Sequence, residues 1–446
     1  MTMERKNFVE PMKEVSITTI DSLTPSLFEA LLKRKFQDSP PIQSVVAERV
    51  NQGVLSHVYR VQVKYAINDD DKDGILAGHE REKVEVIVPP SRWIVKLCRN
   101  ELNLSWMFQA EKAFYESFGP RLFSSDYDVP FQIPNLLVAS SSYLILEECP
   151  DTCCHDLEKG CPTAKIDFLM KALACWHALC WESPLFQNSS RNQQCLYKND
   201  CPGMGQRMHP LQEESLFVQK WKDTLEHLEL KNTIETQFAN ALCQKLAPLR
   251  LRDCHGKVHN ERWTCVHGDF HIANWLFFPN SGNDGFSNTT NTSSYDRTKP
   301  VLVDWATFGY GNPMIDVAFF LVVSTNDEVV SDIEPWLQGY YHTLTTRNPT
   351  ISVSYRTLRE WFQWALLRQW MILVAYDEMC RQIGAAEPDP LKRQTQLQHF
   401  QNVNRRTILA MKSVGSWDEI LSQIPKATEE ERHQAKSYSN RTPLAI

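Results

Sequence analysis

The residues with the clearest chemical potential lie in two short stretches of the C-terminal half. A His-Gly-Asp triplet ends at Asp269 after an apolar run, and Asn274 follows five residues later. Asp304 ends a second apolar run. Phosphoryl transfer needs one carboxylate to orient the attacking hydroxyl, and a second carboxylate with an amide oxygen to hold Mg²⁺ against the phosphates. Asp269, Asp304 and Asn274 would supply these groups at the ends of short strands, where side chains are held rigidly.

The same chemistry requires a lysine that positions the phosphates, and the N-terminal part of the chain offers one. Lys96 lies in the short apolar run Trp93–Leu97, which is typical of a strand. Glu111 follows in a stretch with helical spacing of its apolar residues, Leu104–Phe118. A helix glutamate that holds a strand lysine is expected in such sites, so we predict that Glu111 pairs with Lys96. Glu116 is the competing choice.

Two segments together, HGDFHIANWLF (267–277) and VLVDWATFGYGNPMIDVAFF (301–320), resemble the aminoglycoside phosphotransferase and choline-kinase-like superfamily. The resemblance is closest to its ecdysteroid-kinase-like branch. The family pattern is His-Gly-Asp-x-x-x-x-Asn, an apolar strand ending in Asp-Trp or Asp-Phe, then Gly-x-Pro and Asp-Leu-Ala. A helical family signature, Ala-x-x-His-Ala-x-x-Trp, matches residues 174–181. The resemblance spans about residues 45–380.

The resemblance implies an α+β, bilobal, protein-kinase-like fold. Its N-terminal lobe would be an antiparallel sheet with one helix, and its C-terminal lobe would be mostly helical. It also implies ATP and Mg²⁺ as cofactors, with Asp269 as the catalytic base. Asn274 and Asp304 would be the magnesium ligands. His267 would brace the catalytic loop, and Asp316 would fix that loop from inside the next helix.

The nucleotide-binding segments are less clearly marked. The loop that would cover the phosphates, residues 51–59, carries one glycine, Gly53, and so departs from the glycine-rich loop of protein kinases. Ser56 is the candidate for this contact, because the small-molecule branch often uses a serine and backbone amides. The run that ends in Glu147 and Glu148 resembles the family's hinge, which contacts adenine through main-chain groups. An ordinary edge strand is the alternative interpretation.

Hydrophobic periodicity and turn residues predict the elements that would position these groups. Strands are expected at 45–50, 54–65, 84–88, 93–97, 136–139, 143–146, 264–266, 275–278 and 301–303. Helices are expected at 25–36, 104–118, 166–181, 213–228, 233–246 and 358–376. The expected organisation is an N-terminal arm (1–40), an ATP-binding lobe (41–149), a catalytic and substrate lobe (150–425) with a flexible polar loop (279–299), and a polar tail (426–446).

Composition restricts the class of protein. The 446 residues carry a net charge of −7, so affinity for nucleic acid or an anionic membrane is not expected. No stretch reaches the length of an apolar membrane span, and the N-terminus has no signal-peptide core. The 13 cysteines are therefore expected to be reduced in a cytoplasmic protein. A zinc site at 153–161 is disfavoured, because its spacing matches no common zinc motif.

The predicted activity is transfer of the γ-phosphoryl group to a hydroxyl of a small molecule. Protein kinase activity is disfavoured, because HRD, DFG and APE segments are absent from the sequence. Residues 354–413 carry nine Lys/Arg and five Asp/Glu, whereas a polycationic acceptor or choline would need clustered carboxylates. A neutral, partly apolar alcohol is therefore expected. The alternatives are a choline- or aminoglycoside-type kinase and a non-catalytic nucleotide-binding pseudokinase.

Overall fold

The computed structural model includes most of the elements predicted to carry the site residues. The described residues are 17, 19–37, 39–52, 56–66, 89–99, 105–123, 128–155, 157, 159–183, 214–227, 237, 239–241, 264–279, 295–386, 389–415 and 417–418. Gly53, the expected strand 84–88, the tail 426–446, nearly all of the expected helix 233–246 and residues 280–294 of the expected loop lie outside the described residues.

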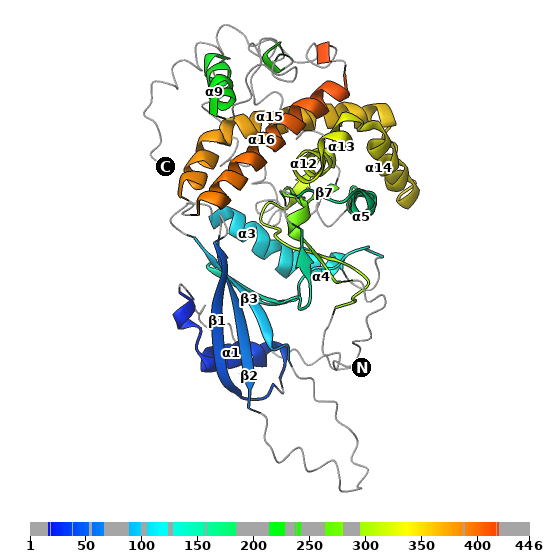
Figure 1. Cartoon of the computed structure of the whole chain (residues 1–446). Helices are drawn as coiled ribbons and strands as arrows, with labels where there is room; N and C mark the ends of the chain where they lie inside the picture. Colours follow the sequence, from blue (N-terminus) through cyan, green and yellow to red (C-terminus); the bar gives the residue numbers. More distant parts are fainter. Residues whose placement is uncertain are drawn as a thin grey trace, which may run out of the picture. The chain divides into compact units, whose positions relative to one another are not determined.

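The chain divides into two compact units (Figure 1). Unit 1 comprises Met1–Leu122, Pro134–Pro150 and Ser281–Tyr295. Unit 2 comprises Phe123–Ile133, Asp151–Asn280 and Asp296–Ile446.

Unit 1 is built on a five-stranded antiparallel sheet. Its strand order is β1-β2-β3-β5-β4, with β1 at Ile42–Gln52, β2 at Ser56–Tyr65, β3 at Arg92–Cys98, β4 at Leu136–Ala139 and β5 at Tyr143–Glu147. Helix α1, Pro25–Lys35, begins after Thr24, whose hydroxyl accepts a hydrogen bond from the Leu27 N–H. Phe28 of α1 and Trp93 of β3 meet edge to face in the core that covers one face of the sheet.

A helical segment follows β3 along the chain. Helix α3, Ser105–Ala113, continues into a π-helical turn, η4 (Phe114–Phe118), and a short helix, α4 (Gly119–Leu122). The sequence predicts one regular helix here, and the observed path differs in its second half. Three aromatic side chains of the π-helical segment are buried: Phe114, Tyr115 and Phe118. Their burial favours the wider helical turn.

Unit 2 is mostly helical and contains two small antiparallel sheets. One sheet pairs β7 (Thr264–Val266) with β10 (Gly309–Gly311), and the other has the order β6-β8-β9 with β6 at Cys153–Cys154, β8 at Trp275–Phe277 and β9 at Val301–Leu302. The helices are α5 (Thr163–Cys180), α9 (Glu214–His227), α12 (Met314–Ser324), α13 (Asp327–Ser331), α14 (Glu334–Arg347), α15 (Tyr355–Ala386) and α16 (Pro390–Ser413), with a 3₁₀ turn, η7, at Ile272–Asn274.

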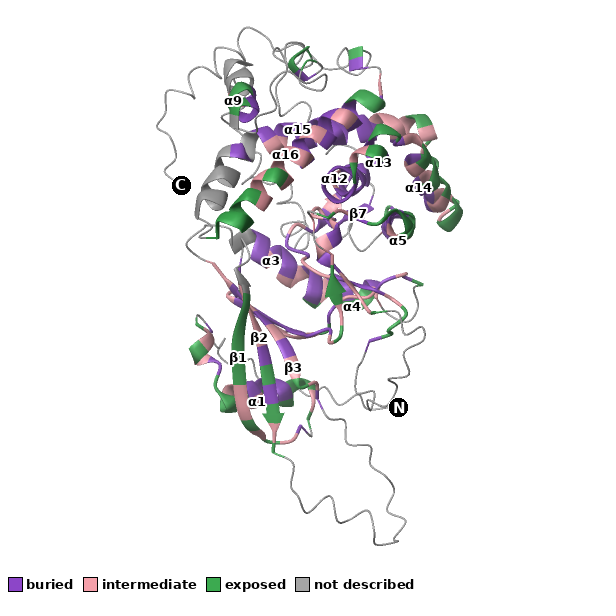
Figure 2. Cartoon of the chain, viewed as in Figure 1, coloured by how far each residue is buried: buried purple, intermediate pink, exposed green. Residues whose placement is uncertain are grey.

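Helix α12 lies at the centre of unit 2. All of its residues except Phe319 are buried, as the purple colouring in Figure 2 shows. The predicted α+β class, with an N-terminal antiparallel sheet and a mostly helical C-terminal part, is confirmed. Among the described helices, none is long and apolar enough to cross a membrane.

Candidate active site

The turn that carries Asp269 is held by one buried carboxylate. Asp316, in the first turn of α12, is 0% exposed. Its Oδ2 accepts the N–H of His267 and its Oδ1 accepts the N–H of Gly268, both at 2.7 Å. Because a carboxylate accepts these two bonds in a dry environment, both are strong. Asp316 therefore fixes the backbone that leads directly to Asp269.

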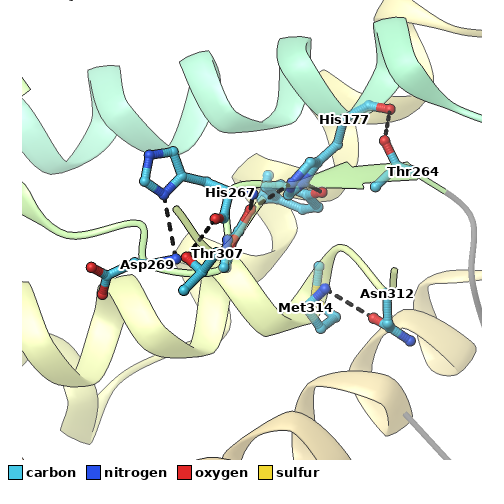
Figure 3. Close-up of polar contacts among 10 residues, drawn as sticks. His177, Thr264, His267, Asp269, Thr307, Asn312 and Met314 are labelled. Carbon is cyan, nitrogen blue, oxygen red and sulfur yellow. Dashed lines mark hydrogen bonds and ion pairs between the residues drawn. The ribbon is translucent and has the colours of Figure 1, made fainter. Parts of the chain in front are cut away.

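Gly268 is required by the path of this turn. Its φ is +80°, and a Cβ built on it would lie 2.4 Å from the carbonyl oxygen of Thr307. The hydroxyl of Thr307 donates to the His267 carbonyl at 2.9 Å (Figure 3). The backbone at Thr307 and the turn that carries Asp269 are thus too close together for any side chain at position 268.

His267 links the turn to the strand that precedes Asp304. Its Nε2 lies 3.0 Å from the Val303 carbonyl, and its Nδ1 accepts the Asp269 N–H at 3.3 Å. A carbonyl can only accept, so the ring is neutral with its proton on Nε2. Burial lowers the pKa of His267, which outweighs the raising effect of the nearby carboxylates, chiefly Asp316.

The two expected magnesium ligands flank two adjacent strands: Asn274 directly precedes β8, and Asp304 follows β9. The Asn274 Nδ2 donates a hydrogen bond to the Asp269 carbonyl at 2.9 Å. The amide oxygen, Oδ1, is therefore the Asn274 atom that would bind Mg²⁺. The Val303 N–H donates to the Asn274 carbonyl at 3.0 Å, which places Asp304 beside Asn274. One carboxylate and one amide oxygen suit Mg²⁺, which takes its remaining ligands from phosphate and water.

Asp304 and Asp269 each have a distinctive setting. Asp304 has φ +66°, a backbone conformation that is uncommon outside glycine and concentrates at functional sites. The Asp269 side chain is 34% exposed, and His271 Nε2 lies 3.5 Å from its Oδ2. Burial acts to raise the pKa of Asp269, but His271, His267 and Asn274 outweigh it and lower the pKa. Asp269 is therefore ionised at neutral pH, as a hydroxyl-orienting base must be.

A buried chain behind Asp316 extends the site and was not predicted. His177 of α5 places Nε2 3.3 Å from Asp316 Oδ2 and Nδ1 2.6 Å from the Tyr340 hydroxyl of α14. The carboxylate can only accept, so His177 donates from Nε2 and accepts from Tyr340. Asp316 thus receives a third donor. The sequence signal for this contact is the histidine of the family signature at 174–181, which is His177.

In unit 1 the lysine and the glutamate meet. Lys96 Nζ lies 2.6 Å from Glu111 Oε1, and their side chains are 13% and 3% exposed. Glu116 lies instead in the η4 turn, where burial raises its pKa against the opposing effect of Lys112. Ser56 is buried at the start of β2, opposite Cys98 of β3.

The carboxylates of the expected hinge are bound to protein groups. Glu148 forms ion pairs with Arg60 at 2.7 Å and with Arg92 at 2.9 Å. Glu147 accepts from the Asn135 side chain at 2.9 Å. Both carboxylates therefore hold the segment in place, and main-chain groups are what the segment would offer a nucleotide base.

Known proteins give an independent comparison. Residues 52–348 match the ecdysteroid kinase-like family. A Ralstonia eutropha structure described as an aminoglycoside phosphotransferase shares 12% identity, covering 87% of this chain and 97% of that chain, with a TM-score of 0.43. A microcompartment-associated aminopropanol kinase shares 12%, covering 87% and 99%, with a TM-score of 0.40. The choline kinase LicA from Streptococcus pneumoniae shares 14%, covering 85% and 99%, with a TM-score of 0.37.

No curated protein matches the chain. The family match covers more than half of the 446 residues and includes the turn at Asp269, Asn274, Asp304 and Asp316. The chain belongs to the ecdysteroid kinase-like family of kinase-like phosphotransferases.

Proposed function

We propose that this protein transfers the γ-phosphoryl group of ATP, with Mg²⁺, to a hydroxyl of a neutral, partly apolar small molecule. The observation that carries the proposal is the clamped turn at Asp269. Three donors converge on the buried Asp316 carboxylate, and the backbone that they fix presents an ionised Asp269 beside Asn274. Such a rigid carboxylate suits phosphoryl transfer, in which catalysis is mostly positioning and electrostatic stabilisation.

Each residue would act through groups that the structure defines. Asp269 would accept a hydrogen bond from the acceptor hydroxyl and take its proton as the new O–P bond forms. Asn274 Oδ1 and Asp304 would bind Mg²⁺, which when bound neutralises phosphate charge. Lys96, held by Glu111, would contact the phosphates, and Ser56 would lie at the phosphate-covering loop. The main chain of residues 147–149 would contact the base.

The acceptor class follows from charge in unit 2. Residues 354–413, which include α15 and α16, carry nine Lys/Arg against five Asp/Glu. Trp361, Phe362, Trp364 and Trp370 of α15 are all buried. A polycationic acceptor would need carboxylates to offset its desolvation, and this surplus of positive charge disfavours it. A hydroxylated lipophile, such as a sterol-like secondary metabolite, meets no such penalty.

The test is ADP release by the full chain with MgATP and a library of neutral hydroxylated lipophiles, aminoglycosides and choline. Asp269→Asn is the matched inactive variant, because it keeps the size of the side chain and removes its basicity. We expect this variant to lose about 10²–10⁴ in turnover while nucleotide affinity changes little. Efficient turnover of choline or kanamycin alone would overturn the acceptor class. Nucleotide binding without turnover of any alcohol would indicate a pseudokinase.

A further inference from the structure

Tyr295 is a buried tyrosine whose role the family pattern does not supply. It lies in the polar stretch that separates the Asn274 strand from the Asp304 strand, a stretch longer than the family pattern requires. Its side chain is 7% exposed. Composition predicts a flexible polar loop at residues 279–299, whereas Tyr295 near its end is buried.

The hydroxyl of Tyr295 is hydrogen-bonded to the segment expected to contact the nucleotide base and to the start of β4. It donates to the Glu147 carbonyl at 3.3 Å and accepts the Asn135 N–H at 3.3 Å. The thiol of Cys149 also hydrogen-bonds to it. The phenolic proton thus goes to the Glu147 carbonyl, and a lone pair accepts the Asn135 N–H. All three partners belong to the strands β4 and β5 or to residues that adjoin them.

The main chain around Glu147 depends on this contact. Its N–H donates to the Asn135 carbonyl at 2.8 Å, and the Glu148 N–H donates to the Arg92 carbonyl at 3.1 Å. Strand β5 ends at Glu147, so Glu148 and Cys149 lie beyond the sheet ladder. Tyr295 therefore contacts the chain on both sides of Glu148, through the Glu147 carbonyl and the Cys149 thiol.

The residue after Tyr295 is fixed separately. Asp296 exchanges two hydrogen bonds with the Gln132 side chain: its N–H donates at 2.8 Å and its carbonyl accepts at 2.7 Å. Gln132 also donates to the Lys299 carbonyl at 2.9 Å, and its backbone carbonyl accepts the Leu302 N–H at 2.8 Å. The chain between Tyr295 and β9 is thus anchored to Gln132 at Asp296, Lys299 and Leu302.

We propose that Tyr295 is a positioning residue for nucleotide binding, which holds the main chain of residues 147–149 in the conformation that contacts the base. The inference rests on the proposed function, because it assumes that this segment binds the base of ATP. Tyr295 itself touches no substrate and acts through Glu147 and Cys149.

The variant is Tyr295→Phe in the full chain, which keeps the buried ring and removes only the hydroxyl. The matched control is Tyr341→Phe, which removes a tyrosine hydroxyl that donates to the Val353 carbonyl at 3.1 Å in the helical part of unit 2. Two probes are titrated against each protein by displacement of a fluorescent ATP analogue. One is MgATP, and the other is Mg²⁺ tripolyphosphate, which has the phosphates and lacks the base. Melting temperature without ligand is measured in parallel.

We expect Tyr295→Phe to weaken MgATP binding about three- to tenfold, the effect of one hydrogen bond. The affinity for Mg²⁺ tripolyphosphate and the melting temperature of Tyr295→Phe should match those of Tyr341→Phe. Equal weakening for both probes, or MgATP affinity equal to that of Tyr341→Phe, would overturn the inference and leave the proposed function standing. Failure of the wild-type protein to bind either probe would overturn both.

Discussion

At the scale of single residues, the site depends on backbone conformations that few side chains tolerate. Gly268 and Asp304 both have positive φ values, +80° and +66°. For Gly268 the reason is steric, since the Thr307 carbonyl occupies the place of a Cβ. Asp304 directly follows Val303, whose N–H is hydrogen-bonded to the Asn274 carbonyl. The strained backbone therefore lies next to the expected magnesium site.

Gly268→Ala should therefore destabilise the protein. The added methyl group would overlap a backbone oxygen and the φ value is unfavourable for alanine, so we expect a loss of about 1–3 kcal/mol. Gly339→Ala is the matched control, because position 339 lies in helix α14 with nothing within 4 Å of a built Cβ. That control should gain up to about 1 kcal/mol in urea unfolding. A Gly268→Ala protein as stable as wild type would refute the close approach of Thr307.

Asp304→Ala should separate metal binding from nucleotide binding. The change removes a carboxylate from the expected magnesium site, where the ion is the largest local charge. Nucleotide affinity should fall about tenfold or more with Mg²⁺ and change little in EDTA, measured by the same titration. Equal losses under both conditions would show that the variant is misfolded rather than deficient in metal.

At the scale of elements, the stretch between β8 and β9 has two parts with different properties. The composition of residues 281–293 is polar, with Asn, Ser, Thr and Gly, and cannot bury a core. The anchor that follows, residues 295–299, carries the Tyr295 contacts and several hydrogen bonds to Gln132. A loop that composition presents as uniform thus ends in a structural segment.

Deletion of 281–293 should shift the melting temperature by no more than a few degrees and leave ADP release intact. Deletion of 281–298 should cost substantially more, because it removes the buried Tyr295 ring and the two hydrogen bonds that Asp296 exchanges with the Gln132 side chain. The comparison of the two deletions by thermal melting locates the boundary. Equal melting temperatures would mean that the anchor contributes nothing to stability.

At the scale of the whole molecule, the buried histidines make stability depend on pH. Burial lowers the pKa of His177, which outweighs the raising effect of Asp316. The unfolded chain takes up a proton near pH 6.5, whereas the folded protein keeps this ring neutral to a lower pH. The stabilisation is therefore fully present above about pH 6.5 and is lost as the pH falls below it.

Urea unfolding at pH 7.5 and pH 5.5 would measure this loss. Each such histidine contributes a slope of up to about 1.4 kcal/mol per pH unit below pH 6.5. His177→Gln keeps a donor for Asp316 and cannot titrate, so its stability at pH 7.5 should be lower and its acid slope shallower than that of wild type. His342→Gln, at an exposed position of α14, is the control and should leave the slope unchanged. An unchanged acid slope in His177→Gln would show that His177 is not a source of the pH dependence of stability.

The sequence by itself determined where the residues of the expected site lie along the chain and which local elements hold them. Asp269 and Asn274 lie five residues apart between strands β7 and β8, and Asp304 follows strand β9, which pairs with β8. Local spacing fixes such groups, because the strand and the turn are short and their apolar residues set which way each side chain faces. The order of strand and helix also predicts that Lys96 pairs with Glu111, fifteen residues later, and the two side chains are hydrogen-bonded in the structure.

Only the tertiary structure decided the contacts between residues far apart in sequence. His177 and Asp316 are separated by 139 residues, and Tyr295 and Glu147 by 148. No local period connects such pairs, and a histidine in an apolar helix or a tyrosine in a polar loop has many possible partners. The partner is selected when buried polar groups must all be satisfied at once, and this condition belongs to the packed molecule rather than to any segment of the chain.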